Sequence, residues 1–137
     1  MKKLLLLTLL CFSINGFAHN WKKVTKFSNG LVYVDVDSIK KDDNVIYFWV
    51  LWDLFKPTPV ATRGARSMDN VFYSYSSISK YKADYSVDVY IILSSSPYTL
   101  QMGKGRKITT TTPNSMFYPK PNETESKLIK FACDNAK

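Results

Sequence analysis

The chain has 137 residues, of which 45% are hydrophobic and 15% aromatic, and it carries a formal net charge of +8. This composition excludes a disordered or low-complexity polypeptide, which has too few aromatic and aliphatic side chains to form a core. The length suits one domain with a modest core. The positive charge favours contact with acidic partners, although lysines scattered along a chain also serve solubility.

The first 18 residues have the layout of a secretory signal peptide. Met1–Lys3 is cationic, Leu4–Ile14 is an apolar run, and Gly16–Ala18 offers the small residues of a cleavage site. The run is short for a bilayer span, and no second run of about 18 apolar residues follows, which disfavours an uncleaved anchor. We therefore expect residues 1–18 to be removed and residues 19–137 to form a single exported domain, periplasmic or at the surface of a bacterium.

Removal of the signal peptide leaves 17 basic and 11 acidic residues, a net charge of +6. The domain then opens with a predicted hairpin of Trp21–Phe27 and Leu31–Val36, because the Asn-Gly pair in Ser28–Gly30 tolerates positive φ. Asp37–Ile39 is predicted as a short helical turn and Lys41–Asn44 as a second turn.

Three further segments are predicted before the C-terminal region. Val45–Leu54 is rich in β-branched and aromatic residues, which indicates a central strand. Prolines and a glycine predict a loop over Phe55–Arg66. Ser79–Leu93 alternates apolar and polar residues and is expected to be a bent strand or a tight hairpin. Its predicted buried face consists of Tyr81, Ala83, Tyr85, Val87, Val89, Ile91 and Leu93.

The C-terminal region changes character. Ser94–Pro121 is expected to form short extended pieces broken by prolines and glycines. Asn122 with Glu125 approximates a capping box, and the apolar residues that follow recur at helical spacing, so we predict an amphipathic helix of about three turns. Its apolar face includes Cys133, the single cysteine left after signal removal. This thiol is expected to be buried or to form an intermolecular disulfide in a homodimer.

Catalytic and metal-binding side chains are scarce. The only histidine, His19, stands at the expected start of the mature chain, so no Ser-His-Asp or Cys-His system is expected. Copper at His19 would need a further strong ligand, and Asp35, Asp37, Asp42 and Asp43 lack the glycine and distal glutamate of an EF-hand. We therefore expect no enzyme, no cofactor, no metal, no small-molecule substrate and no nucleic-acid ligand.

The segment Met102–Lys107, with the sequence MGKGRK, resembles a phosphate-binding loop at first sight. A Walker-type loop has four residues between its first two glycines and leads into a helix, whereas this motif has one residue between its glycines and leads into four threonines. The glycines are therefore predicted to occupy positive-φ turn positions. Lys104, Arg106 and Lys107 are expected to be solvated or to form a small tip that contacts a polyanion or a partner protein.

Several of these segments, taken in order, carry a resemblance to a known family. They are Trp21, Val32–Asp35, Asp37–Ile39, Trp49–Asp53, Ser77, Met102–Gly105 and the helix that ends at Cys133. Over most of residues 21–133 the chain resembles the bacterial surface-adhesin protein E-like proteins. The resemblance implies an α+β fold, with an antiparallel sheet of about five to six strands and one C-terminal α-helix packed on its concave face.

The family resemblance also implies a disulfide between the helix and the sheet, and the chain departs from that pattern. Counting back from Met102, the first family cysteine falls on Tyr85. We predict that Tyr85 and Cys133 are neighbours within about 10 Å, since bridged Cα atoms lie about 5.5–6 Å apart. Their contact would replace a cross-link that contributes about 2–4 kcal/mol.

Two classes of function remain open. The resemblance implies an exported, non-enzymatic binding module that contacts host proteins, and the net charge extends this to polyanions. The alternative is a periplasmic or envelope protein with a structural or inhibitor-like role. An inhibitor of basic lysozymes would be expected to be acidic, whereas this chain is basic. The resemblance also permits a homodimer.

Overall fold

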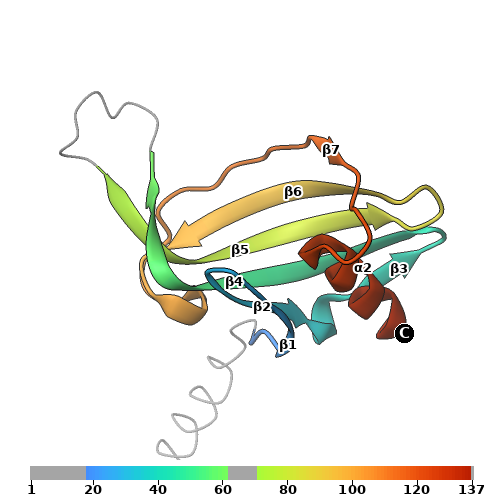
Figure 1. The fold of residues 1–137 in the computed structure, drawn as a ribbon, viewed down its shortest axis with the longest axis horizontal. Coiled ribbons are helices and arrows are strands. Elements are labelled where there is room, and N and C mark those ends of the chain that lie inside the picture. The colour runs from blue at the N-terminus through green and yellow to red at the C-terminus, as the bar shows by residue number, and fades with distance from the viewer. Residues whose placement is uncertain (1–17, 62–70, 137) are drawn as a thin grey trace, which may run out of the picture.

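The protein forms a single antiparallel sheet with one helix across it (Figure 1). The structure, a computed structural model, describes residues 18–61 and 71–136. Most of the predicted signal peptide and the second half of the loop predicted over Phe55–Arg66 lie outside this part of the chain. Among the described residues, no helix is long and apolar enough to cross a bilayer.

Seven strands make up the sheet in the described part of the chain, in the order β1-β2-β4-β5-β6-β7, with β3 paired to β4. The strands are β1 (Trp21–Phe27), β2 (Gly30–Asp35), β3 (Lys40–Asp42), β4 (Val45–Val60), β5 (Phe72–Asp84), β6 (Val89–Tyr98) and β7 (Met116–Phe117). The other elements are the 3-10 turns η1 (Val36–Ser38) and η3 (Gln101–Gly103) and the helix α2 (Thr124–Asp134). The predicted α+β class is confirmed. The count exceeds five to six because β3 and β7 are too short to give a sequence signal.

The predicted hairpin between β1 and β2 is confirmed, and Gly30 also has a packing role. Gly30 lies opposite Leu54 of β4, and a Cβ atom there would overlap the main-chain carbonyl of Asp53. A residue with a side chain would therefore push β2 away from β4. The helical turn predicted at Asp37–Ile39 is present as η1, one residue earlier.

One face of the sheet holds the core, beneath α2. The core is a cluster of nearly inaccessible side chains from the sheet and the helix, namely Val32, Val34, Ile46, Phe48, Val50, Tyr81, Ala83, Leu128 and Ala132. The Phe48 and Tyr81 rings meet edge to face with centroids 5.6 Å apart, a favourable aromatic geometry. The helix lies against β1 and β4, so residues from both ends of the domain close the core.

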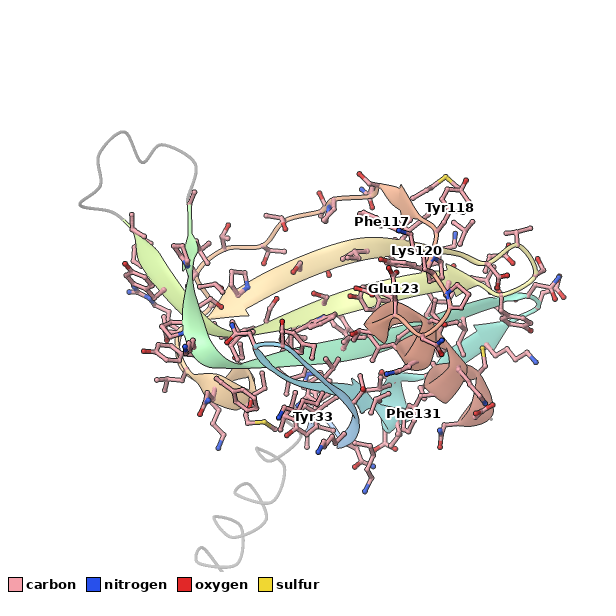
Figure 2. The ribbon with its side chains drawn as sticks, in the orientation of Figure 1. Tyr33, Phe117, Tyr118, Lys120, Glu123 and Phe131 are labelled. Carbon is pink, nitrogen blue, oxygen red and sulfur yellow. The ribbon has the colours of Figure 1, made fainter. Side chains whose placement is uncertain are left out.

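The predicted helix is confirmed, but its predicted cap is wrong. The N-cap residue is Glu123, which makes no side-chain capping bond. Asn122 instead has φ of 68°, a left-handed conformation that asparagine tolerates in turns. The Glu123 carboxylate turns back and accepts the main-chain N–H of Lys120 at 3.1 Å, in the segment that joins β7 to α2 (Figure 2).

The predicted loop over Phe55–Arg66 is wrong for its first part, because β4 continues to Val60. The register between β4 and β5 shifts between Asp53 and Thr58, which marks an irregular, bulged segment. Beyond Leu54 the strand no longer pairs with β2. Asn29 still bonds the main chain of Phe55 and Lys56 on that side. From Pro57 onward this side of β4 has no strand partner, and an unpaired strand edge accommodates proline.

Ser79–Leu93 is a hairpin, one of the two predicted outcomes, with its turn between Asp84 and Val89. Beyond this turn the predicted buried face is confirmed at Val89, which is 8% exposed, but it is wrong at Val87 and Ile91. Val87 is 60% exposed, and Ile91 pairs with Lys82 on the face opposite the core. Tyr90 and Ile92 pack against the core instead. In the sequence, apolar residues stay at odd-numbered positions on both sides of the turn. In the structure, the residues that face the core are odd-numbered before the turn and mainly even-numbered after it.

Candidate binding face

The face of the sheet opposite α2 carries aromatic rings and lysines, and we refer to it as the open face. Side chains alternate between the two faces of a strand, so the residues next to the core positions of β4 and β5 point to this side. The open face comprises Tyr47, Trp49, Lys80 and Lys82 at its centre, with His19, Trp21, Lys40, Tyr98 and Lys107 around them.

Strand register sets each central lysine of the open face beside an aromatic ring. Trp49 pairs with Lys80 and Tyr47 pairs with Lys82 across β4 and β5. The Lys80 Nζ lies 5.8 Å from the Trp49 ring centroid, and the Lys82 Nζ lies 5.9 Å from that of Tyr47. Both distances suit cation–π attraction, which holds the ammonium groups near the rings while leaving them in contact with water.

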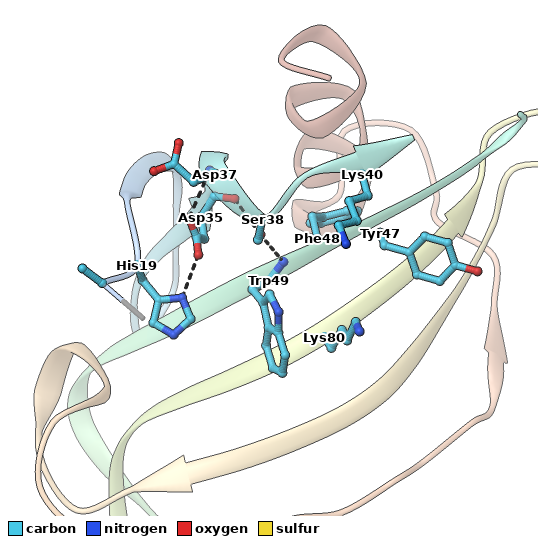
Figure 3. A pocket seen from close by; sticks show the side chains of 10 residues that line it. His19, Asp35, Asp37, Ser38, Lys40, Tyr47, Phe48, Trp49 and Lys80 are labelled. Atoms are coloured by element: carbon cyan, nitrogen blue, oxygen red, sulfur yellow. Dashed lines mark hydrogen bonds and ion pairs between the residues drawn. The ribbon is translucent and has the colours of Figure 1, made fainter. Parts of the chain in front are cut away.

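A buried carboxylate, Asp35, fastens the start of the domain to the open face. Asp35 is 5% exposed and accepts hydrogen bonds from His19 Nδ1 at 2.7 Å and from the main-chain N–H groups of Asn20 and Asp37 at 3.1 Å each. The His19 ring stacks on Trp21 with centroids 4.6 Å apart. Since three donors already engage Asp35, this carboxylate orients the N-terminal segment and is not free to bind a ligand (Figure 3).

The Asp35 network extends to Trp49 through η1. The Ser38 hydroxyl donates to the main-chain carbonyl of Asp35 at 2.7 Å and accepts the main-chain N–H of Trp49 at 3.0 Å. The His19 and Trp49 rings lie edge to face, 6.4 Å between centroids. Together these contacts hold the His19 and Trp49 side chains next to each other on the open face, and we refer to this pair of rings as the wall (Figure 3).

Two cavities adjoin this wall. The first has a volume of about 350 Å³, and its lining includes Asp37, Ser38, Lys40, Tyr47 and Lys80. The second has a volume of about 390 Å³ and is lined by Ile78, Ser96, Tyr98 and Lys107. His19 and Trp49 line both cavities. Each cavity therefore offers ring surface, hydroxyl groups and at least one ammonium group.

The MGKGRK segment closes one end of the open face. The main-chain N–H of Met102 donates to the Asp53 carboxylate at 2.7 Å, and that of Gly103 donates to the Ser76 hydroxyl at 2.8 Å. Gly103 has φ of 67° and approaches the sheet so closely that a Cβ atom would lie 2.7 Å from Ile78 Cδ1. Gly105 has φ of 78°, so both predicted positive-φ glycines are confirmed.

The three cations predicted from this segment lie in different surroundings. Lys107 lines the second cavity. The guanidinium carbon of Arg106 lies 5.8 Å from the Phe72 ring centroid, at the start of β5. Lys104 is exposed and ends η3. Contact of Lys104, Arg106 and Lys107 with one partner therefore remains a proposal, and Lys107 is the one that belongs to the open face.

Most of the open face has no signal in the sequence alone. Lys80 and Lys82 were visible as the polar positions of an alternating strand, but their aromatic neighbours lay in an apolar run that was predicted only as a central strand. Only the register of β4 against β5 brings Tyr47 and Trp49 beside these lysines. Register depends on how distant segments pair, and single-strand patterns do not contain it.

The comparison with known families decides the assignment. The family model described as Surface-adhesin protein E matches residues 21–134. The chain belongs to the surface-adhesin protein E family. Among curated proteins, none matches this chain.

Solved structures of protein E from Haemophilus influenzae share the fold. One has 16% sequence identity and a TM-score of 0.60, with 88% of each chain covered. A second crystal form has 17% identity and a TM-score of 0.61, and covers 88% of this chain and 91% of that one. Protein E from a non-typeable strain has 17% identity and a TM-score of 0.54, over 82% and 75% of the two chains. At this identity the likeness shows the fold.

In this member of the protein E family, Tyr85 and Cys133 line a common cavity of about 230 Å³ between the β5–β6 turn and α2. The Tyr85 hydroxyl donates to the main-chain carbonyl of Asp43 at 2.7 Å, and the Lys41 Nζ lies 5.5 Å from its ring centroid. Burial, followed by the charge of Asp134, raises the pKa of the Cys133 thiol. Cys133 is a free thiol that packs against the core.

Proposed function

We propose that this protein is an exported, adhesin-type binding module that holds an acidic partner against its open face. Family membership supports a role in adhesion, and the predicted signal peptide supports export to the periplasm or cell surface. The observation that carries the proposal is the set of lysines on the open face. Within residues 18–61 and 71–136, Lys40, Lys80, Lys82 and Lys107 form no ion pair.

The carboxylates near these lysines support the same proposal. Asp35 and Asp53 both accept hydrogen bonds from main-chain N–H groups, so they are directed toward the protein. Asp37, an exposed carboxylate that lines the first cavity, offsets only part of the lysine charge, so the open face presents a net positive charge beside ring surfaces. Such a surface attracts acidic partners from a distance and offers apolar contact once they arrive.

The partner is held by side chains under this proposal. At the open face, β4 pairs with β2 and β5, and β5 pairs with β4 and β6, so the central main-chain groups are already bonded. A partner cannot add a strand there and must use the rings, hydroxyls and ammonium groups. This mode of binding needs no catalytic side chain, in agreement with the expectation of a non-enzymatic protein.

Retention on immobilised matrix proteins and on heparin, measured across a salt series, tests the proposal. We expect salt-sensitive retention that falls by about tenfold in affinity in the Lys80→Gln/Lys82→Gln double variant. Lys127→Gln, an exposed change on α2, is the matched control and should keep wild-type retention. Equal retention of both variants would refute the open face as the site. No retention of the wild type on any ligand would favour the structural or inhibitor-like alternative.

A further inference from the structure

We infer that the acidic partner of the open face is an acidic polysaccharide that crosses the wall of His19 and Trp49 and places one sugar unit in each adjoining cavity. This inference rests on the proposed function and specifies its ligand. By acidic polysaccharide we mean a chain of sugars that carry carboxylate or sulfate groups.

The two cavities repeat the same set of groups, which favours a ligand with repeating units. The first offers the ring and hydroxyl of Tyr47 and the Lys40 and Lys80 ammonium groups, while its Ser38 hydroxyl is already bonded to the main chain of Asp35 and Trp49. On the other side of the wall, a ring, a hydroxyl and an ammonium group recur as Tyr98, Ser96 and Lys107. Their volumes, about 350 and 390 Å³, are similar and fall in the range of small-ligand sites.

The chemistry of each cavity matches a sugar acid better than other anions. A pyranose ring has a C–H face that packs on aromatic rings, hydroxyl groups that bond to hydroxyls, and an acidic group that pairs with an ammonium group. Polyphosphate would use the lysines and leave the rings without a partner. An acidic peptide would bring main-chain donors and acceptors to a surface whose own central main-chain groups are already paired within the sheet.

The charges of Lys80 and Asp37 favour one orientation of the acidic group of the sugar. Lys80 Nζ rests 5.8 Å from the Trp49 ring centroid, so a sugar that takes its place on the ring meets the displaced ammonium at once. Asp37, an exposed carboxylate, also lines the first cavity. Repulsion from Asp37 turns the acidic group of the sugar toward Lys40 and Lys80.

The two tryptophans of β4 provide an internal test. Trp49 lies on the open face, whereas Trp52 lies on the core face, where its ring meets Phe27 edge to face at 5.1 Å. In the exported, ¹⁵N-labelled protein, short oligosaccharides of hyaluronan (carboxylate only) and of heparin (carboxylate and sulfate) should shift the indole N–H signal of Trp49. The Trp52 signal should stay in place. The chain has three tryptophans, so the Trp49→Phe and Trp52→Phe variants together assign these two signals and leave the third to Trp21.

Matched polyanions separate this inference from the proposed function. We expect at least one oligosaccharide to bind about tenfold more tightly than polyglutamate or polyphosphate of equal charge, and Lys80→Gln/Lys107→Gln to lose about tenfold. Lys127→Gln should bind as the wild type does. Equal binding of polyglutamate or polyphosphate, or a shift of Trp52 in place of Trp49, would overturn the sugar assignment and leave an acidic partner intact. Absence of binding by every polyanion and every matrix protein would overturn both.

Discussion

The two faces of β4 differ in what they contact, although their residues are interleaved in one segment. Phe48, which is 1% exposed, points into the core beneath α2, and its neighbours Tyr47 and Trp49 point to the open face. A single step along the chain therefore separates a residue that holds the fold from one available to a ligand. The period of two lets one strand supply stability on one side and recognition on the other.

The open face is itself divided. Leu51 is on the same side as Trp49 but is fully buried, because η3 folds over it and over Ile78. The MGKGRK segment thus seals one end of the face, while the two cavities remain accessible beside it.

The largest expected effect tests the separation of the two faces directly. Phe48→Ala should lower the free energy of unfolding by about 3–5 kcal/mol, because it leaves a cavity in the core. Tyr47→Ala, one residue away on the open face, should change it by about 1 kcal/mol or less. Urea unfolding followed by circular dichroism measures both. Similar losses in the two variants would show that the faces do not differ in this way.

A cross-link between the end of β5 and α2 tests the comparison on the face of the sheet that α2 covers, which we refer to as the covered face. Tyr85→Cys is predicted to form a disulfide with Cys133 under oxidising conditions, which should raise the free energy of unfolding by about 2–4 kcal/mol over the reduced form of the same variant. Thiol titration and intact mass report the bond. Two free thiols in the oxidised, folded variant would show that the alignment of Tyr85 with the family cysteine is wrong.

The seal on the open face gives a smaller effect. Gly103→Ala should cost about 1–3 kcal/mol, because alanine at φ of 67° is strained and its Cβ atom would press on Ile78. Lys104→Ala, the next residue and exposed, is the control and should be near neutral. Thermal unfolding of both proteins makes the measurement. A neutral Gly103→Ala variant would indicate that η3 does not hold the sheet.

The smallest effect concerns the edge of the covered face at high pH. Burial, assisted by the charges of Glu125 and Glu123, raises the pKa of Tyr90 from 10.0 to about 12. The unfolded chain therefore loses this proton first, so stability from Tyr90 is complete below pH 10 and declines as pH rises toward about 12. Tyr90→Phe should flatten this part of the melting-temperature profile. An unchanged slope would show that Tyr90 does not contribute to it.

The sequence predicted the parts of the fold that local chemistry determines. Asn29-Gly30 predicted the first hairpin, and the helical spacing around Leu128 and Ala132 predicted α2. The capping prediction failed because Asn122 has two uses in proteins, as a cap and as a left-handed turn residue. Local signals of equal strength do not distinguish these uses.

Other features depended on contacts between distant segments. The prolines at 57 and 59 predict a loop from sequence alone, and only the loss of the β2 neighbour explains why a strand accepts them. The candidate site follows the same rule. The motif predicted Lys107 as a site residue. Lys80 and Lys82 are recognised as site residues only from their register against Trp49 and Tyr47.

The attachment of His19 to Asp35 has a practical consequence for handling the protein. Ala18 lines the first cavity beside His19, so a peptide joined at this end of the domain would begin at that cavity. An affinity tag placed there would compete with ligand. A tag placed after α2 leaves from the other side of the sheet, which makes the C-terminus the better position for labels, surface coupling and pull-down.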